Sequence, residues 1–302
     1  MSTNTTPTHV TVLPASTQSG EATIRALLNA EQQPTVRGIY RDASKAPKEF
    51  TSNPRFDAAK GDIDLWSGLD FRGSDAVFYN PPPPFDGRDP AVFAAQTANN
   101  VLATLKRLPS VKRLVISSAM GSQHERGTGM LRLNHVTDLV LKKAVPEVVI
   151  VKPAYYYQTW AAAAKAKGTE KLCFESLLED PDYKIPMVSV EDLGKRCAEY
   201  LLGSSEASKQ RLRTVDLHGP RDYSAIDVHN AIEKATGKKW ELVNIPKERL
   251  AEHFAKEVPE LLRGDDKGHA PGRSARSGVQ RGENMVRGTV ELEDALQRMV
   301  SE

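Results

Sequence analysis

Short runs of β-branched and aromatic residues alternate with longer amphipathic segments along the first half of this chain of 302 residues. The short runs that we expect to be strands are His9–Leu13, Val36–Tyr40, Asp75–Tyr79, Val111–Ser117 and Glu147–Lys152. Between them, apolar residues recur at helical spacing in Glu21–Ala30, Ala91–Leu108 and Leu131–Ala144. Strands joined through helices pair in parallel, because each helix crosses back over one face of the sheet. The sequence therefore predicts an α/β fold with a doubly wound parallel sheet.

The pattern loosens after Pro153, and the rest of the chain predicts a smaller unit. We expect residues 1–8 to be a disordered tail, residues 9–160 to form the core, and residues 161–302 to form a C-terminal α+β subdomain. Within this subdomain, residues 185–220 are expected to return to the core. Residues 264–288 are rich in Gly, Arg and Ser and lack apolar periodicity, which predicts a flexible loop.

Composition excludes several classes of protein. The chain has 41 Lys and Arg against 39 Asp and Glu, and the formal net charge of +2 gives no global field that would attract nucleic acid. No apolar run approaches the roughly 18 residues that span a membrane, and the N-terminus lacks the pattern of a secretory signal. The two cysteines and the scattered histidines have no metal-ligand spacing. We expect a cytoplasmic protein without a metal site, whose partner is a small-molecule substrate.

The turn between the first strand and the first helix is the place where a dinucleotide pyrophosphate would bind. Such a site uses backbone N–H groups, the helix N-terminus and glycines that allow close approach. Here Gly20 stands at the third glycine position, whereas Pro14 and Thr17 replace the first and the second. Ser16, Thr17 and Gln18 can still offer hydroxyl or amide groups to a phosphate. The turn predicts a Rossmann-like core with a weakened dinucleotide site.

The end of the second expected strand favours one dinucleotide over the other. A residue there faces the adenosine ribose, where an acid prefers the free 2′-hydroxyl and an arginine accepts a 2′-phosphate. Arg41 comes first and Asp42 follows. We therefore expect NADP rather than NAD as the cofactor.

The order of these features resembles the NmrA-like family of atypical short-chain dehydrogenases/reductases. The resemblance rests on the segments Val36–Asp42, Gly61–Asp62, Ala76–Pro82, Val115–Ala119, Val149–Tyr155, Met187–Gly194 and Val215–Gly219, together with the turn at Gly20. It implies a Rossmann fold with a small C-terminal subdomain on the substrate side, and NAD(P) binding. It also implies that Asp62, Asn80, Asn134 and Pro153 are cofactor-binding residues. Members of this family include reductases and redox-sensing regulators that bind a dinucleotide without chemistry.

The chain departs from the catalytic pattern that the resemblance would supply. Short-chain dehydrogenases use a Tyr-x-x-x-Lys helix, in which the tyrosine donates a proton and the lysine lowers its pKa. Here Met130 stands at the tyrosine position and Asn134 at the lysine position. An asparagine can hydrogen-bond a ribose but cannot lower a neighbouring pKa by its charge.

Other residues could carry the chemistry. His135 and Asp138 lie three residues apart, so we expect them to meet on one helix face as an acid/base pair. Ser118 follows the fifth strand, where the resemblance places a substrate-polarising hydroxyl. The expected lining of a substrate pocket is His124, Tyr155, Tyr156 and Tyr157.

Three functions remain open from the sequence. The first is an NADP-dependent oxidoreductase of secondary metabolism that acts on a small aromatic or polyketide-type metabolite. The second is a redox-neutral isomerase, dehydratase or cyclase, which the changes at Pro14 and Thr17 favour. The third is a non-catalytic dinucleotide sensor that binds a partner protein, which the loss of the Tyr/Lys pair favours.

Overall fold

The computed structural model describes residues 8–65, 68–84, 86–126, 128–164, 172–203, 211–249 and 284–301. Its main sheet has eight strands in the order β13-β10-β6-β5-β4-β1-β2-β3, and every neighbouring pair is parallel. The strands are β1 (His9–Leu13), β2 (Thr35–Tyr40), β3 (Phe56–Lys60), β4 (Ala76–Tyr79), β5 (Arg113–Ser117), β6 (Glu147–Pro153), β10 (Leu212–His218) and β13 (Met285–Arg287). Of the expected disordered tail, residues 1–8, the first seven lie outside the described residues.

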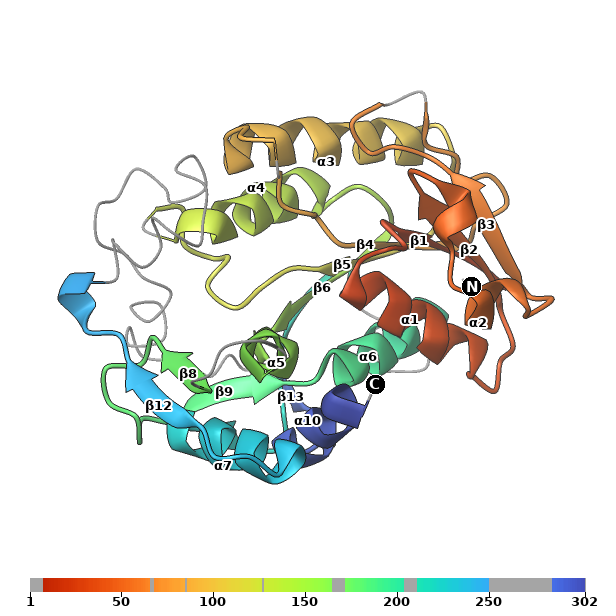
Figure 1. Cartoon of the computed structure of the whole chain (residues 1–302). Coiled ribbons are helices and arrows are strands. Elements are labelled where there is room, and N and C mark those ends of the chain that lie inside the picture. Colours follow the sequence, from red (N-terminus) through yellow and green to blue (C-terminus); the bar gives the residue numbers. More distant parts are fainter. Residues whose placement is uncertain are drawn as a thin grey trace.

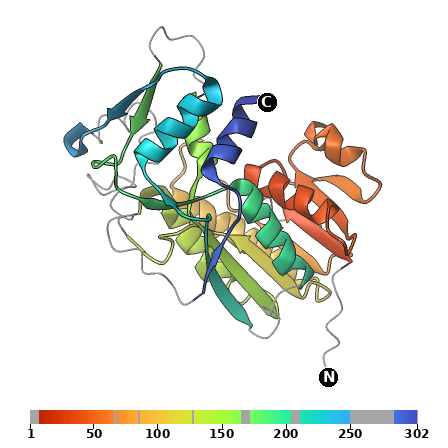
Figure 2. The same ribbon diagram turned by 90° about the horizontal axis from the view of Figure 1, so that it is seen from below.

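Helices cover both faces of this sheet, so the predicted doubly wound α/β fold is confirmed. Helices α3 (Pro90–Lys106) and α4 (Arg132–Leu141) lie on one face, and α1 (Gln18–Leu28) and α6 (Val190–Leu202) lie on the other (Figure 1). Seen from below, α1 and α6 run side by side across the strands (Figure 2). Alternate strand residues enter separate hydrophobic clusters: Val12 and Val115 pack toward α1 and α6, whereas Leu114 and Ile116 pack toward α3 and α4. Two short helices, η1 (Ala43–Lys45) and α2 (Lys48–Thr51), join β2 to β3.

Side-chain caps fix where the long helices begin. Asp89 accepts hydrogen bonds from the Ala91 and Val92 N–H groups, both at 2.9 Å, at the start of α3. Ser189 accepts one from the Glu191 N–H at 3.0 Å at the start of α6. These oxygens satisfy backbone donors that have no partner within the helix. Helix α6 ends at Gly203, whose φ of 74° is the left-handed conformation that glycine adopts without strain.

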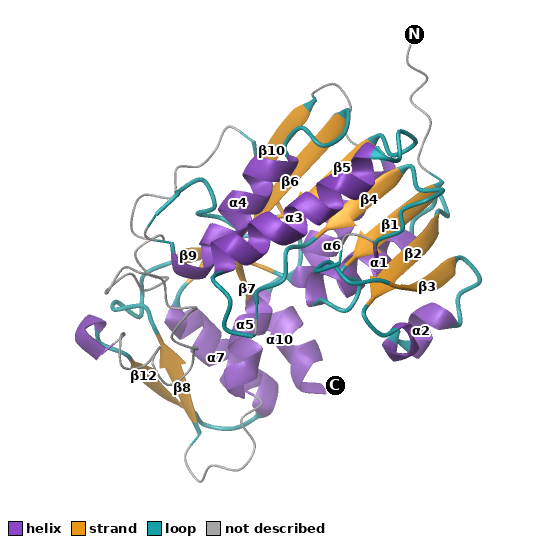
Figure 3. Ribbon diagram, turned by 90° about the horizontal axis from the view of Figure 1, so that it is seen from above, coloured by secondary structure: helices purple, strands orange, loops and turns teal. Residues whose placement is uncertain are grey.

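A second, smaller lobe packs beside the sheet (Figure 3). Its own hydrophobic cluster runs from Tyr157 to Leu296 and is separate from the two clusters of the main sheet. The lobe comprises helices α5 (Tyr157–Ala164), α7 (Ala225–Thr236) and α10 (Leu292–Ser301), and strands β7 (Tyr155–Tyr156), β8 (Cys173–Ser176), β9 (Ile185–Val188), β11 (Asp222–Tyr223) and β12 (Glu241–Asn244). The short 3-10 helices are η3 (Gly129–Leu131) and η5 (Lys247–Arg249).

The end of the predicted flexible loop 264–288 is ordered, which corrects that prediction for its last residues. Residues 264–283 lie outside the described residues, but Met285–Arg287 forms β13 along β10. Two carboxylate oxygens of buried Asp192 on α6 accept the Thr289 N–H at 3.1 Å and the Val290 N–H at 3.0 Å. These contacts tie the C-terminal segment to the core, and sequence periodicity gives no sign of them.

Within the described residues, no helix combines the length and the apolar character that crossing a lipid bilayer would require.

Candidate functional site

The strand order reverses direction between β1 and β4. From β1 the chain proceeds to β2 on one side, and from β4 it proceeds to β5 on the other. In open α/β sheets, ligands bind beyond the carboxyl ends of the strands at such a point. The N-terminus of α1 and residue Asn80, which directly follows β4, both lie at this edge, and the Asn80 N–H donates to the Leu13 carbonyl oxygen at 3.0 Å.

Gly20 holds α1 against the turn that follows β1. A Cβ atom at this position would stand 2.4 Å from the Pro14 carbonyl oxygen and 3.1 Å from that of Ala15. No side chain fits there without moving the backbone. Gly20 therefore has the close-packing role of the third glycine in a dinucleotide-binding turn.

Thr17 does not project freely toward the ligand edge. It is the N-cap of α1, and its hydroxyl oxygen accepts the Gly20 N–H at 3.0 Å and donates to the Pro14 carbonyl oxygen at 3.1 Å. The cap therefore uses one backbone N–H that a phosphate could have bound. Ser16 and Gln18 are exposed beside it.

Arg41 and Asp42 differ sharply in their surroundings. The Asp42 carboxylate accepts hydrogen bonds from the Ser44 N–H at 3.1 Å and the Ser44 hydroxyl at 2.7 Å, and these bonds lower its pKa. Arg41 is exposed at the end of β2 and makes no ion pair with any described residue. The acid is engaged in a turn, while the cation is available to a ligand.

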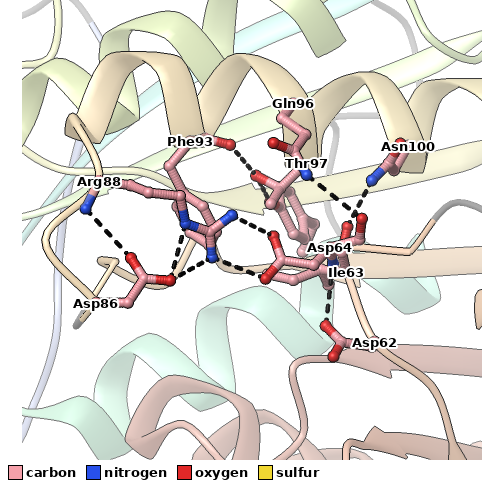
Figure 4. A network of polar contacts seen from close by, with 10 residues as sticks. Asp62, Ile63, Asp64, Asp86, Arg88, Phe93, Gln96, Thr97 and Asn100 are labelled. Carbon is pink, nitrogen blue, oxygen red and sulfur yellow. Dashed lines mark hydrogen bonds and ion pairs between the residues drawn. The ribbon is translucent and has the colours of Figure 1, made fainter.

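A network of charged side chains holds the loop after β3 in place (Figure 4). The Arg88 guanidinium binds Asp64 through two N–H···O contacts of 3.0 and 2.9 Å, binds Asp86 at 2.8 Å, and stacks on the Phe93 ring. The Asp62 carboxylate in turn accepts the Asp64 N–H at 3.0 Å. The half-buried Asp62, the expected cofactor ligand, is thereby fixed relative to α3.

Asn134 and Pro153 lie in the interior at the same edge. Pro153 is buried at the end of β6, and its carbonyl oxygen accepts the Met120 N–H at 3.1 Å. Asn134, in the first turn of α4, is 9% exposed, yet its side-chain amide makes no hydrogen bond with a described residue. The amide is not among the fully buried polar atoms that lack a partner, so it remains accessible at this edge. The exposed Arg41, the close-packed Gly20 and this amide fit a dinucleotide that extends from β2 to α4.

Ser118, Ser122 and Asp138 form a cluster between β5 and α4. The Ser118 hydroxyl donates to Asp138 Oδ2 at 2.7 Å, and the Ser122 hydroxyl donates to the same oxygen at 2.9 Å. The two hydroxyl oxygens lie 3.1 Å apart. The second carboxylate oxygen, Oδ1, is buried without a hydrogen-bond partner among the described residues.

Burial governs the protonation of Asp138. It raises the pKa of this carboxyl to about 6, against the opposing effects of the two serine hydroxyls and the positive charges of Lys152 and His135. The side chain therefore exchanges its proton close to neutral pH.

The expected direct pairing of His135 with Asp138 is wrong. His135 Nδ1 lies 2.8 Å from the Ser122 carbonyl oxygen, and a carbonyl can only accept, so Nδ1 carries the hydrogen of this bond. Asp138 instead bonds the two serine hydroxyls. Both side chains reach Ser122, His135 through the Ser122 carbonyl oxygen and Asp138 through the Ser122 hydroxyl, so they share a partner and are not bonded to each other.

The four expected pocket residues separate into three groups. Tyr157 is fully buried in the core of the second lobe, where its hydroxyl donates to the Val290 carbonyl oxygen at 3.2 Å, so its assignment to a pocket is wrong. Tyr155 and Tyr156 are only half-buried, and burial raises the pKa of each to about 12. His124 is exposed on the loop after β5, beside Gln123.

Sequence reasoning missed Ser122, Asp64 and Arg88. Ser122 lies in an irregular loop and bonds a helix 16 residues later, and Arg88 reaches an acid 24 residues earlier. A pattern of short spacing could not have found either contact. Within the described residues, no three His, Cys, Asp or Glu side chains are grouped so that they could hold a metal ion.

Solved structures with the same arrangement include enzymes and a regulator. The NADPH-dependent quinone oxidoreductase QOR2 of Escherichia coli, complexed with NADPH, has a TM-score of 0.69 at 16% identity and covers 96% of this chain and 99% of its own. The triphenylmethane reductase of Citrobacter sp., complexed with NADP(H), has a TM-score of 0.70 at 15% identity, over 97% of this chain and 99% of its own. NmrA, a negative transcriptional regulator, has a TM-score of 0.65 at 15% identity, over 97% and 96%.

The chain has the Rossmann-like fold of these proteins. The resemblance inferred from the sequence is thereby confirmed at the level of the fold. Neither a scan against models of protein families nor a search of curated proteins gives a match. This fold alone is compatible with catalysis and with regulation, so the site has to decide between them.

Proposed function

We propose that this protein binds NADP(H) at the carboxyl edge of β1, β2 and β4 and reduces a small, flat aromatic metabolite such as a quinone or a polyketide. Arg41 is the observation that carries the choice of cofactor. It is exposed and without an ion pair among the described residues, whereas Asp42 is held by Ser44. A guanidinium in this position binds a 2′-phosphate with charge-assisted hydrogen bonds.

The residues present support the cofactor from both ends. Gly20 allows close packing at the phosphates, Asp62 is held in position near the adenosine end, and the Asn134 amide is available to a ribose hydroxyl. When bound, the reduced nicotinamide supplies hydride. Tyr155 and Tyr156, which follow β6 at the same edge, offer half-buried aromatic surface to a flat substrate.

Met130 and Asn134 favour a second candidate, a dinucleotide-sensing regulator. The resemblance places them where a catalytic tyrosine and lysine would stand, and NmrA, one of the proteins with this fold, is a transcriptional regulator. Such a protein would bind NADP(H) without consuming it and would transmit the bound state to a partner protein.

Calorimetric titration tests the cofactor. We expect the wild type to bind NADPH more tightly than NADH. Arg41→Ala should weaken NADPH binding by about tenfold to a hundredfold and leave NADH unchanged, because only NADPH carries the 2′-phosphate. Lys106→Ala, which removes an exposed cation at the far end of α3, is the matched control and should change neither affinity. Equal losses for both dinucleotides in Arg41→Ala would contradict the assignment.

Absorbance at the nicotinamide band then separates the two candidates. Loss of this absorbance with 1,4-naphthoquinone or a triphenylmethane dye supports a reductase, whereas tight NADPH binding without turnover supports the sensor. Failure to bind either dinucleotide at millimolar concentration would instead support a redox-neutral enzyme.

A further inference from the structure

The loss of the tyrosine and lysine leaves a reductase on this fold without its usual proton donor. Met130 has no titratable group, and the Asn134 amide does not exchange a proton near neutral pH. Reduction of a carbonyl group by hydride still needs a proton at the carbonyl oxygen. The donor must therefore come from another titratable group at the carboxyl edge of the sheet.

We propose that Ser118, Ser122 and Asp138 form a proton-delivery unit, in which Ser118 contacts the substrate oxygen, Asp138 resupplies the proton and Ser122 positions Asp138. This inference rests on the proposed reductase function. Ser118 is the first residue beyond β5, at the same sheet edge as the N-terminus of α1. Asp138 lies one helical turn beyond Asn134 on α4 and accepts the hydrogen of the Ser118 hydroxyl.

The hydrogen count of the cluster explains how it works. When Asp138 is ionised, Ser118 and Ser122 both donate to Oδ2, so neither hydroxyl hydrogen is free. When Asp138 is protonated, its own O–H can donate to Ser118, and the Ser118 hydrogen becomes available to a substrate. Because Oδ1 is buried without a partner, Ser118 and Ser122 are the only hydrogen-bond partners of this carboxyl among the described residues.

The carbonyl substrate takes up a hydride from the reduced nicotinamide, and a carbonyl oxygen of this substrate takes the proton of the Ser118 hydroxyl. Ser118 regains a proton as the Asp138 carboxyl O–H bond breaks, and the resulting carboxylate is reprotonated from solvent. The products are the reduced substrate, which is a hydroquinone in the case of 1,4-naphthoquinone, and the oxidised dinucleotide.

The surroundings of Asp138 suit this role. Burial disfavours its charged form, whereas Lys152 on β6, His135 on α4 and the two serine hydroxyls favour it, and the balance brings the pKa to about 6. A general acid works best when its pKa is near the working pH. His135 contributes indirectly, because its ring donates to the Ser122 carbonyl oxygen and holds the loop that carries Ser122.

The first test needs no cofactor. The full chain is labelled with ¹³C at the aspartate side-chain carboxyls and titrated by NMR from pH 4 to pH 8. We expect one resonance with a midpoint near pH 6 that is absent in Asp138→Asn. In Ser122→Ala, the carboxylate loses one hydrogen bond, so this midpoint should rise by about one pH unit. An Asp138 resonance that titrates at the ordinary aspartate value, or does not move in Ser122→Ala, overturns the proposal.

The second test follows kcat/KM for 1,4-naphthoquinone with NADPH against pH. The wild-type kcat/KM should fall as the pH rises through about 6. In Ser122→Ala, this falling part of the pH profile should move to higher pH. Asp138→Asn should lower kcat about a hundredfold and remove the limb, and Ser118→Ala should lower kcat similarly, with the Kd of NADPH unchanged in both. Ser110→Ala, an exposed serine away from the site, is the control.

The outcomes separate this proposal from the proposed function. If NADPH does not bind, the reductase fails, and the NMR titration still decides whether Asp138 and Ser122 are coupled. If Asp138→Asn reduces the quinone at the wild-type rate between pH 5 and pH 8, the proton-delivery unit is overturned and the reductase stands. A wild type that binds NADPH but reduces neither probe also overturns the unit. If Asp138→Asn does not fold, the pH profile of kcat/KM in Ser122→Ala decides, because a profile that does not move to higher pH overturns the unit.

Discussion

The Arg88 guanidinium faces the Asp64 carboxylate edge to edge, with Nη1 3.0 Å from Oδ1 and Nη2 2.9 Å from Oδ2. The two residues belong to the loops that follow β4 and β3, so this pair joins two loops at the ligand edge of the sheet (Figure 4). Its geometry is the bidentate form that fixes orientation as well as distance. Because Asp64 is hydrogen-bonded to Asp62, the orientation of Asp62 depends on Arg88.

Arg88→Ala should therefore weaken the adenosine end of the dinucleotide site. We expect the Kd values of NADPH and of 2′,5′-ADP to rise about tenfold, while that of nicotinamide mononucleotide stays unchanged. The pair is partly exposed, so the free energy of unfolding should fall by less than about 1 kcal/mol. Arg72→Ala is the matched control, since Arg72 also pairs with an aspartate two residues before it but makes no ion pair with a second acid among the described residues. An unchanged Kd for 2′,5′-ADP in Arg88→Ala would contradict this role.

Thr17→Gly should strengthen dinucleotide binding. Removal of the Thr17 hydroxyl frees the Gly20 N–H for a phosphate, so calorimetry should give a lower Kd for NADPH, by about threefold. The loss of the N-cap should cost only a few tenths of a kcal/mol, because glycine is itself an acceptable cap. Thr17→Ser keeps the hydroxyl and removes the methyl group, so it should bind NADPH like the wild type. A gain in Thr17→Ser as large as in Thr17→Gly would identify the methyl group as the obstacle instead.

Gly194→Ala should destabilise the whole protein. Gly194 on α6 packs against α1, and a Cβ atom there would stand 2.4 Å from the Ala22 carbonyl oxygen. The two helices must separate, and overpacking of this kind costs about 1–3 kcal/mol in the free energy of unfolding. Urea denaturation should show the loss. Gly68→Ala, where the nearest atom lies at 3.4 Å, should leave stability close to that of the wild type and serves as the control.

Asp138→Asn should change how stability depends on pH. The pKa of Asp138 is about 6 in the folded protein, above its ordinary value near 4, so the folded state retains a proton that the unfolded state loses first. The contribution of this group to the free energy of unfolding is therefore fully present below about pH 4. It is lost as the pH rises through 6, a decrease of about 3 kcal/mol. Asparagine does not titrate, so the variant lacks this decrease in the free energy of unfolding. Urea denaturation at pH 4 and pH 7 should show Asp138→Asn gaining stability relative to the wild type at the higher pH, and a constant difference would contradict the raised pKa.

The sequence by itself determined the fold class and the edge where the site lies. Alternation of short β-rich runs with helical spacing is a local signal, and the eight parallel strands with helices on both faces follow from it. Gly20 and Arg41 could be singled out for the same reason, because Arg41 directly follows β2 and Gly20 lies in the first turn of α1, just after the turn that follows β1.

Only the tertiary structure decided which side chains meet. Three successive tyrosines carry no signal that places Tyr157 in the core while Tyr155 and Tyr156 stay half-buried. Asp138 was expected to meet His135, which lies nearby on its own helix, but the packing of α4 on β5 brings it to Ser118 and Ser122. A hydrogen bond forms only when donor and acceptor lie within a few tenths of an ångström of the ideal separation, and these partners belong to residues far apart in the chain. Periodicity reports the faces of helices and strands, and those distances arise only when the faces pack together.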